Sequence, residues 1–235
     1  MPEHPKLGLI VRDTCQLSDS LKNGRTETVE TKYGAVTLKT DDKWAAVCRS
    51  GFDENVYLMP HEYNTLANLK ALQTLGVSEV VGVHSSGSLR PSLAPGMLMI
   101  PDDWICFEPQ VTTIRGRRKH LTPGFSNRVR QNLASAAWKV QVHFENGGTY
   151  WQTEGPRLET KAEIKLMSSF ADLVGMAMVS EATLAQEMEI EYGAICSVDN
   201  YANGLGRPRL TDEMIVEQCL KNAAAIVRVL DSYLV

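Results

Sequence analysis

The chain has 235 residues, of which 43% are hydrophobic and 22% are charged, and its formal net charge is −4. This length and composition suit one α/β domain that spans residues 1–235 and buries a single sizeable core. Because the balance is slightly acidic, with a pI of about 5.8, no overall positive field attracts nucleic acid or an anionic membrane.

Short apolar runs alternate along the chain with stretches of helical periodicity. In chain order, strands are expected at residues 6–11, 34–40, 44–50, 79–84, 97–101, 148–153, 171–176 and 193–199. Several of these runs are apolar on both faces, which is typical of a sheet covered on both sides. Helices are expected at residues 61–76, 125–139, 159–170 and 181–190.

The last helix has the clearest sequence signals. Thr211 is the expected N-cap, Asp212 and Glu213 lie in the first turn, and an apolar stripe continues to Leu230. Together with the alternating strands, this pattern predicts a single sheet wrapped by helices.

The cellular setting follows from features that the sequence does not contain. It has no charged segment followed by a long apolar run, and no stretch approaches the roughly 18 consecutive apolar residues of a membrane span. The five cysteines are scattered without metal-type spacing, which favours reduced thiols over a disulfide framework or a zinc site. The basic run at residues 114–120 is expected to be a solvated loop. We therefore expect a cytoplasmic protein without a metal or another cofactor.

One segment is placed where ligands of such a sheet gather, in the loops after the strands. TEGPRLETKAEI, residues 153–164, lies between an expected strand and the helix after it, and Glu159 stands where that helix should begin. Taken alone, Glu159 is explained by the helix dipole, which stabilises an exposed carboxylate by less than about 1 kcal/mol.

The wider sequence resembles the trimeric purine nucleoside phosphorylase and methylthioadenosine phosphorylase family. The resemblance is carried by TEGPRLETKAEI, by ADLVGMAMVSEATLAQEMEIEYGAICSVDNYANG after it, and by MPHEYNTLANLKALQTLGVSEVVGVHSSGSLR and PGMLMIPDDWI before it. It extends from about residue 6 to the C-terminus, with a shortened segment around 110–130. It implies a nucleoside phosphorylase fold, with a twisted, partly barrel-like mixed sheet surrounded by helices, and a homotrimer with sites near the subunit interfaces.

The resemblance also implies a reaction and its ligands. In this family the bond between a purine base and C1′ of ribose is broken with phosphate as the acceptor, as in purine salvage. Because the transition state has a positively charged sugar and an electron-rich leaving base, the protein must stabilise negative charge on the base and supply a nucleophile below the sugar. The expected ligands are a purine nucleoside and phosphate.

Glu159 and Asn200 match the family's base-recognising pair, and Asn200 is the implied catalytic residue on the leaving base. An Asn amide donates to O6 and accepts from a protonated N7, while a carboxylate accepts from N1–H. The pair therefore suits inosine, guanosine or 5′-methylthioinosine, and the local match is nearer to methylthioinosine and 6-oxopurine phosphorylases than to adenine-specific enzymes. A turn residue is the alternative for Asn200. The resemblance further implies substrate contacts from Met176, for which core packing is the alternative, and from Ser85.

The phosphate site departs from the family pattern after the first strand. The family has a glycine-rich loop whose amides and hydroxyl bind phosphate, but this chain has Val11, Arg12 and Asp13 in those places. A carboxylate 4 Å from a phosphate charge costs about 4 kcal/mol near a protein surface, whereas an arginine is a strong phosphate partner. In the alternative interpretation, Asp13 merely pairs with Arg12 or caps a turn.

Other positions that bind phosphate in the family also carry different residues in this chain. Arg49 is retained, but Ser50 replaces a histidine, His84 replaces a threonine or asparagine, and Ala177 replaces a serine or threonine. The implied phosphate-binding residues are Arg12, Arg49, Ser50 and a protonated His84. The alternative is that His84 is a core histidine whose hydrogen bonds are all made within the protein.

Two other functions therefore stay open. If water rather than phosphate enters, Asp13 or His84 is the general base of a nucleosidase. If neither enters, the chain is a catalytically silent nucleoside-binding protein.

One further family residue concerns assembly. A histidine ahead of a variable loop reaches into the neighbouring subunit's site, and His120 in RKHLTPGF is the nearest match. We therefore expect a cyclic homotrimer with His120 near the 5′ end of the partner's nucleoside pocket. A solvated loop histidine is the alternative.

Overall fold

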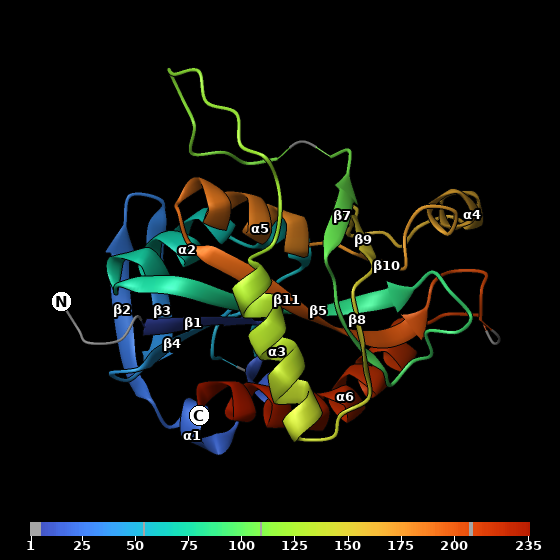
Figure 1. Cartoon of the computed structure of the whole chain (residues 1–235), viewed down its shortest axis with the longest axis horizontal. Coiled ribbons are helices and arrows are strands. Elements are labelled where there is room, and N and C mark those ends of the chain that lie inside the picture. Colours follow the sequence, from blue (N-terminus) through green and yellow to red (C-terminus); the bar gives the residue numbers. More distant parts are fainter. Residues whose placement is uncertain (1–5, 54, 109, 207–208) are drawn as a thin grey trace.

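The computed structural model describes residues 6–53, 55–108, 110–206 and 209–235. Within these residues an eleven-stranded mixed sheet has the order β2-β3-β4-β1-β5-β10-β9-β7, and β11, β6 and β8 branch from β5 (Figure 1). The strands are β1 Lys6–Val11, β2 Arg25–Thr31, β3 Gly34–Thr40, β4 Trp44–Cys48, β5 Val77–Ser88, β6 Leu98–Ile100, β7 Asp103–Cys106, β8 Phe144–Asn146, β9 Thr149–Gln152, β10 Leu173–Gly175 and β11 Glu191–Tyr201. The α-helices are α1 Asp19–Lys22, α2 Thr65–Thr74, α3 Asn127–Lys139, α4 Lys161–Met167, α5 Met178–Glu187 and α6 Asp212–Leu234. Two short 3-10 helices, η1 Thr14–Gln16 and η2 Pro60–Glu62, lie in loops.

The middle of the sheet is parallel. β1 pairs in parallel with both β4 and β5, and β5 pairs in parallel with β11. The end of β5 then pairs antiparallel with β10, which continues the sheet through β9 to β7. The carboxyl ends of β1, β4, β5 and β11 therefore meet in one region, where loops from distant parts of the chain converge.

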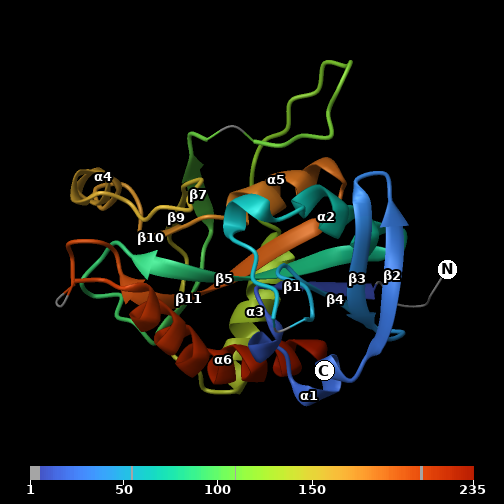
Figure 2. The ribbon, with the colours of Figure 1, turned by 180° about the vertical axis from the view of Figure 1, so that it is seen from behind.

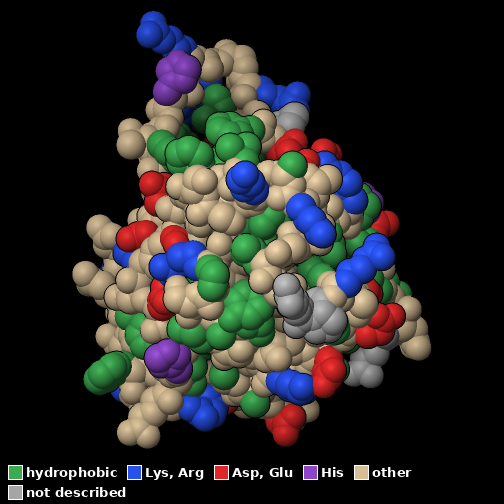
Figure 3. Space-filling model, turned by 90° about the vertical axis from the view of Figure 1, so that its right-hand side faces the viewer, with side chains coloured by type: hydrophobic (Ala, Val, Ile, Leu, Met, Phe, Trp, Pro, Cys, Tyr) green, Lys and Arg blue, Asp and Glu red, His purple; other side chains and the backbone are tan. Residues whose placement is uncertain are grey.

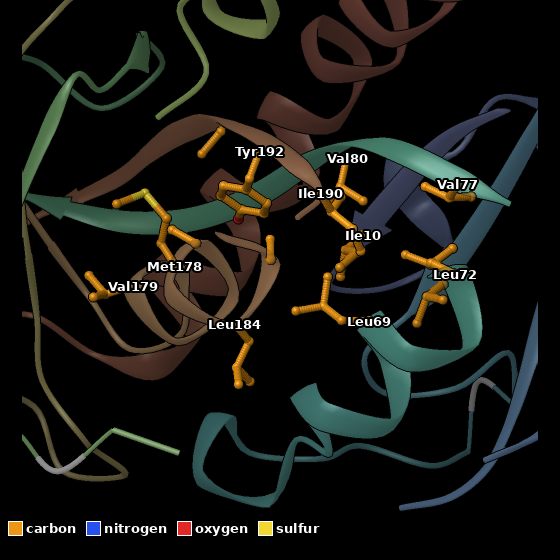
Figure 4. Packing of buried hydrophobic residues seen from close by; sticks show 14 of the residues in the cluster. Ile10, Leu69, Leu72, Val77, Val80, Met178, Val179, Leu184, Ile190 and Tyr192 are labelled. Carbon is orange, nitrogen blue, oxygen red and sulfur yellow. The ribbon is translucent and has the colours of Figure 1, made fainter. Parts of the chain in front are cut away.

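Helices cover both faces of the sheet, with α2 and α5 on one face and α3 and α6 on the other (Figures 1 and 2). Side chains of β1 alternate between the two layers, because successive residues of a strand point to opposite faces. Ile10 packs among the residues of α2 and α5, as Figure 4 shows, whereas Leu9 and Val11 pack among those of α3 and α6. Each such buried aliphatic side chain stabilises the fold by about 1.5–3 kcal/mol.

The predicted α/β fold, a twisted mixed sheet surrounded by helices, is confirmed. All eight expected strands are present, and β5 is longer at both ends than the expected 79–84. Sequence patterns missed β2, β7 and β8. The side chains of β2 are mostly polar and exposed, while β7 and β8 have only four and three residues.

The predicted helices are present but differ from their expected bounds at both starts and ends. Thr211 caps α6 as expected, because its Oγ1 accepts from the amide of Met214 at 3.4 Å. α5 begins at Met178, three residues before the expected start, and α4 begins at Lys161 rather than at residue 159. None of the described helices combines the length and apolar character needed to cross a bilayer.

Candidate active site

A cavity of about 200 Å³ lies at the carboxyl ends of the parallel strands. Its walls come from the loops after β1 and β4, from the second half of β5, from β9 and β10, and from the end of β11. The sequence-predicted site residues that line it are Arg12, Arg49, His84, Ser85, Glu159, Met176 and Asn200. Asp13, Ser50 and His120 are not among its lining residues.

Glu159 does not serve the helix that follows it. Thr160 is the N-cap of α4, and its hydroxyl and the Glu163 carboxylate form a reciprocal capping box. The Glu159 side chain is only 6% exposed and accepts a hydrogen bond from the Thr153 hydroxyl at 2.7 Å. A hydrogen bond from Asn203 to the Glu159 carbonyl fixes the loop. Glu159 thus precedes the N-cap and is buried, unlike the exposed first-turn acid of the helix-dipole explanation, and it is among the residues that line the cavity.

Asn200 reaches the cavity through an irregularity in β11. The register between β11 and β5 shifts at Asp199, so that Val198 pairs with Ser86 and Asn200 with Gly87. Such a bulge redirects the side chains that follow it. Asn200 donates one amide hydrogen to its neighbour's carbonyl, that of Tyr201, at 2.9 Å. Its second amide hydrogen and its carbonyl oxygen remain for a ligand.

A buried ion pair holds Arg49. Its guanidinium donates to both carboxylate oxygens of Glu181, at 2.5 and 2.9 Å, and to the carbonyl of Val83 at 2.8 Å. The side chains of both Arg49 and Glu181 are 2% exposed. Burial alone would raise the pKa of Glu181, but Arg49 and His84 lower it to about 2. The charge of the one retained phosphate residue is thus neutralised inside the protein.

His84 belongs to the same buried cluster. Its Nε2 lies 3.2 Å from an Arg49 nitrogen and 2.8 Å from the hydroxyl of Tyr192, which in turn donates to Glu181 at 2.9 Å. Burial and the nearby Arg49 lower the pKa of His84 to about 4, although Glu181 acts in the opposite direction. His84 is therefore neutral near pH 7, and the expectation of a cationic His84 for phosphate is corrected.

Arg12 lines the cavity but is also paired. Its Nε donates to Asp13 at 2.7 Å. Asp13 is also the N-cap of η1, because its side chain accepts from the amide of Cys15. Burial would raise the pKa of Asp13, but Arg12 and Cys15 lower it. Asp13 is thus a partner of Arg12 and a turn cap, and it is not placed as a base at the cavity.

The other two predicted residues also lie outside the cavity wall. The Ser50 hydroxyl is buried and makes no hydrogen bond within the part of the chain that the structure describes. His120 is exposed, and its segment, residues 110–126 between β7 and α3, extends away from the sheet in Figure 1. The structure thus does not bring His120 to the cavity of its own chain.

Sequence patterns missed Glu181 and Tyr192, which fix Arg49 and His84. Glu181 is separated from Arg49 by 132 positions, so no local motif connects the two. The available signal was a charged residue in the apolar segment GMAMVSEATLA, because a buried acid requires a partner.

This fold and cavity define a nucleoside-phosphorylase-like protein, and the comparisons with known proteins identify the family. The chain belongs to the phosphorylase superfamily, whose family model matches residues 8–235. It is 42% identical to a probable 6-oxopurine nucleoside phosphorylase of Archaeoglobus fulgidus over 173 residues, which covers 73% of this chain and 71% of that protein. It is 32% identical to a probable S-methyl-5′-thioinosine phosphorylase of Methanocaldococcus jannaschii, with 93% of this chain and 88% of that protein covered.

Solved structures show the same fold. The methylthioadenosine phosphorylase of Schistosoma mansoni in complex with adenine has a TM-score of 0.86 at 21% identity, over 98% of this chain and 91% of that chain. A methylthioadenosine phosphorylase from an antarctic soil metagenomic library has a TM-score of 0.85 at 26% identity, over 97% of this chain and 85% of that chain.

Proposed function

We propose that this protein cleaves the N-glycosidic bond of a 6-oxopurine nucleoside with phosphate as the acceptor. The observation that carries the proposal is that Glu159, from the loop before α4, and Asn200, from the end of β11, line one cavity at the carboxyl ends of the strands. The names of its relatives, 6-oxopurine nucleoside phosphorylase and S-methyl-5′-thioinosine phosphorylase, support the same class of substrate.

The base is recognised by complementary hydrogen bonds. The remaining amide hydrogen of Asn200 donates to O6, its carbonyl oxygen accepts from N7–H, and the Glu159 carboxylate accepts from N1–H. Negative charge develops on the leaving base, and Asn200 stabilises it through the O6 and N7 contacts. Met176 and Ser85 line the cavity wall, where we place the ribose. Phosphate enters from the end of the cavity that contains Arg49, Arg12 and His84.

Base specificity tests this proposal directly. The wild-type protein should cleave inosine with a higher kcat/KM than adenosine, and Asn200→Asp should shift this ratio toward adenosine by about tenfold to 100-fold. The expected size follows from about 1–3 kcal/mol for each mismatched buried hydrogen-bonding group. Asn23→Asp, in the turn after α1, is the matched control and should leave the ratio unchanged. A wild-type protein that prefers adenosine would refute the assignment of Glu159 and Asn200.

A second candidate function, phosphate-independent hydrolysis, is favoured by the electrostatics of the nucleophile end. Both arginines there are paired with carboxylates, and the neutral His84 has the protonation state of a general base. Hydrolysis would release free ribose, whereas phosphorolysis releases a sugar 1-phosphate. The identity of the sugar product therefore separates the two reactions.

We also propose that the protein works as a cytoplasmic homotrimer. Several large apolar side chains are exposed around α4 and the strands beside it, including Phe107 at 82%, Leu166 at 57% and Phe170 at 63%. Figure 3 shows hydrophobic side chains on this side of the molecule. Large apolar side chains exposed together on one side of a molecule are typical of a protein contact. Light scattering at micromolar concentration should give three times the mass of the chain, and a stable monomer would contradict the proposal.

A further inference from the structure

Tyr150 has a buried hydroxyl without a partner. The residue lies on β9, its side chain is fully buried, and it lines the cavity. Its Oη makes no hydrogen bond of good geometry within the described part of the chain. An unsatisfied buried hydroxyl costs about 1–3 kcal/mol, so such groups are rare and call for an explanation.

The hydroxyl of Tyr150 lies at the start of α5. A Cβ atom added to Gly175, two residues before the N-cap, would overlap the Tyr150 oxygen, so a side chain there would displace the hydroxyl. Burial raises the pKa of Tyr150 well above its usual value, whereas the amides of Ala177 and Met178 act in the opposite direction. These two amides thus lie near the phenol oxygen.

The cap of α5 leaves this position available to a ligand. The N-cap residue, Ala177, has no side-chain hydrogen bond to offer. Gln152 instead accepts from the next amides of the helix, those of Val179 at 2.6 Å and Ser180 at 3.3 Å. The start of a ten-residue helix carries partial positive charge, which favours an anion beside Tyr150.

The same end of the cavity contains Arg49 and His84. The rings of His84 and Tyr150 are in edge contact, with centroids 6.4 Å apart. Because Arg49 is paired with Glu181 and Arg12 with Asp13, the guanidinium charges there are already compensated. An anion at this end therefore depends more on neutral donors than on unpaired cations.

We propose that the Tyr150 hydroxyl binds the phosphate co-substrate. Its oxygen faces the amides of Ala177 and Met178, and its proton donates to a phosphate oxygen at the nucleophile end of the cavity. A hydroxyl has one donor and two acceptor positions, so both contacts are possible together. This inference rests on the proposed phosphorolysis. It adds Tyr150, a residue that no motif or spacing in the sequence marks as a phosphate ligand.

The test is Tyr150→Phe, which removes only the oxygen. We expect the KM for phosphate to rise about tenfold, because a hydrogen bond to a charged group is lost. The Kd for hypoxanthine should stay within about twofold. The melting temperature without phosphate should be unchanged or higher, because the hydroxyl makes no hydrogen bond of good geometry to the described residues. Tyr233→Phe, whose hydroxyl donates to Glu79 outside the cavity, is the control and should leave the KM for phosphate unchanged.

Two further measurements keep the inference falsifiable. Inorganic phosphate alone should raise the melting temperature of the wild-type protein and raise it less in Tyr150→Phe. The double variant Tyr150→Phe/Ala177→Ser should recover part of the phosphate affinity, because the serine places a hydroxyl at the same helix start.

The outcomes separate the two claims. An unchanged KM for phosphate and an unchanged phosphate-induced stabilisation in Tyr150→Phe overturn the role of Tyr150 while phosphorolysis stands. A wild-type protein that phosphate neither stabilises nor accelerates overturns both the role of Tyr150 and the proposed phosphorolysis.

Discussion

The two ends of the cavity differ in how their charges are compensated. At the base end, Glu159 accepts from a neutral hydroxyl and forms no ion pair among the described residues, and Asn200 keeps free hydrogen-bonding groups. At the nucleophile end, Arg49 and Arg12 are both paired with carboxylates inside the protein. The base end thus offers unpaired hydrogen-bonding groups to a ligand. At the nucleophile end, the charged groups are already paired with each other inside the protein.

This difference teaches that the two ends should respond differently to substitution. Charged residues at the nucleophile end contribute first to folding and only then to binding, because a buried ion requires a partner. Under the proposed function, polar residues at the base end contribute mainly to ligand choice, because we propose that their remaining hydrogen bonds are made to the base.

The largest expected effect is the loss of Glu181. Glu181→Ala leaves Arg49 buried without its carboxylate and should lower the free energy of unfolding by about 3–5 kcal/mol. Urea unfolding measures this loss. Glu217→Ala, which removes an exposed pair with Lys221 on α6, is the control and should cost at most about 0.5 kcal/mol. Equal stability of the two variants would show that the buried pair is not a structural requirement.

The next effect is the pH dependence of stability through His84. The pKa of His84 in the folded protein, about 4, lies below its ordinary value of 6.5. Below pH 6.5 the unfolded state therefore binds a proton at His84 more readily than the folded state does. The contribution of neutral His84 is therefore complete above pH 6.5 and is lost as the pH falls toward 4, by about 3 kcal/mol. The slope of unfolding free energy against pH should flatten in His84→Asn and persist in His61→Asn, which changes an exposed histidine. The same slope in both variants would mean that His84 does not titrate as proposed.

At the base end, Glu159→Ala should lower the kcat/KM for inosine by between about tenfold and 100-fold, because one hydrogen bond to a buried carboxylate is lost. Steady-state kinetics measure kcat/KM for inosine and for adenosine, and the value for adenosine should fall less. Glu154→Ala changes a side chain outside the cavity and serves as the control. An equal loss for both nucleosides would argue against recognition of N1–H.

The smallest effect sharpens the comparison at Arg12. Asp13→Asn removes the charge that competes with phosphate for this guanidinium, so the KM for phosphate should fall about twofold to fivefold, in line with about 0.2–1 kcal/mol for a partly exposed ion pair. Asp42→Asn, at the exposed pair with Arg25, should leave the KM unchanged. A KM for phosphate that is unchanged or higher in Asp13→Asn would contradict competition between Asp13 and phosphate for Arg12.

The sequence predicted the sheet well because both of its faces are covered, so its strands appear as continuous apolar runs. It singled out Glu159 and Asn200, which both line the cavity, because one lies in a recognisable segment after β9 and the other in one at the end of β11. It did not reveal the ion pair of Arg49 with Glu181 or the free hydroxyl of Tyr150, because these depend on side chains that only the folded chain brings together. The sequence also did not predict β2, because its residues are mostly polar and exposed. This strand is stabilised by pairing with β3 rather than by burial of its side chains.

The most direct test of the proposed function is the rate of hypoxanthine release from inosine as phosphate concentration is varied, with the sugar product identified. Phosphorolysis predicts that the rate is negligible without phosphate, rises to saturation as phosphate is added, and is accompanied by an equal amount of ribose 1-phosphate. Release at the same rate without phosphate, with free ribose as the product, would contradict it and establish the hydrolytic alternative.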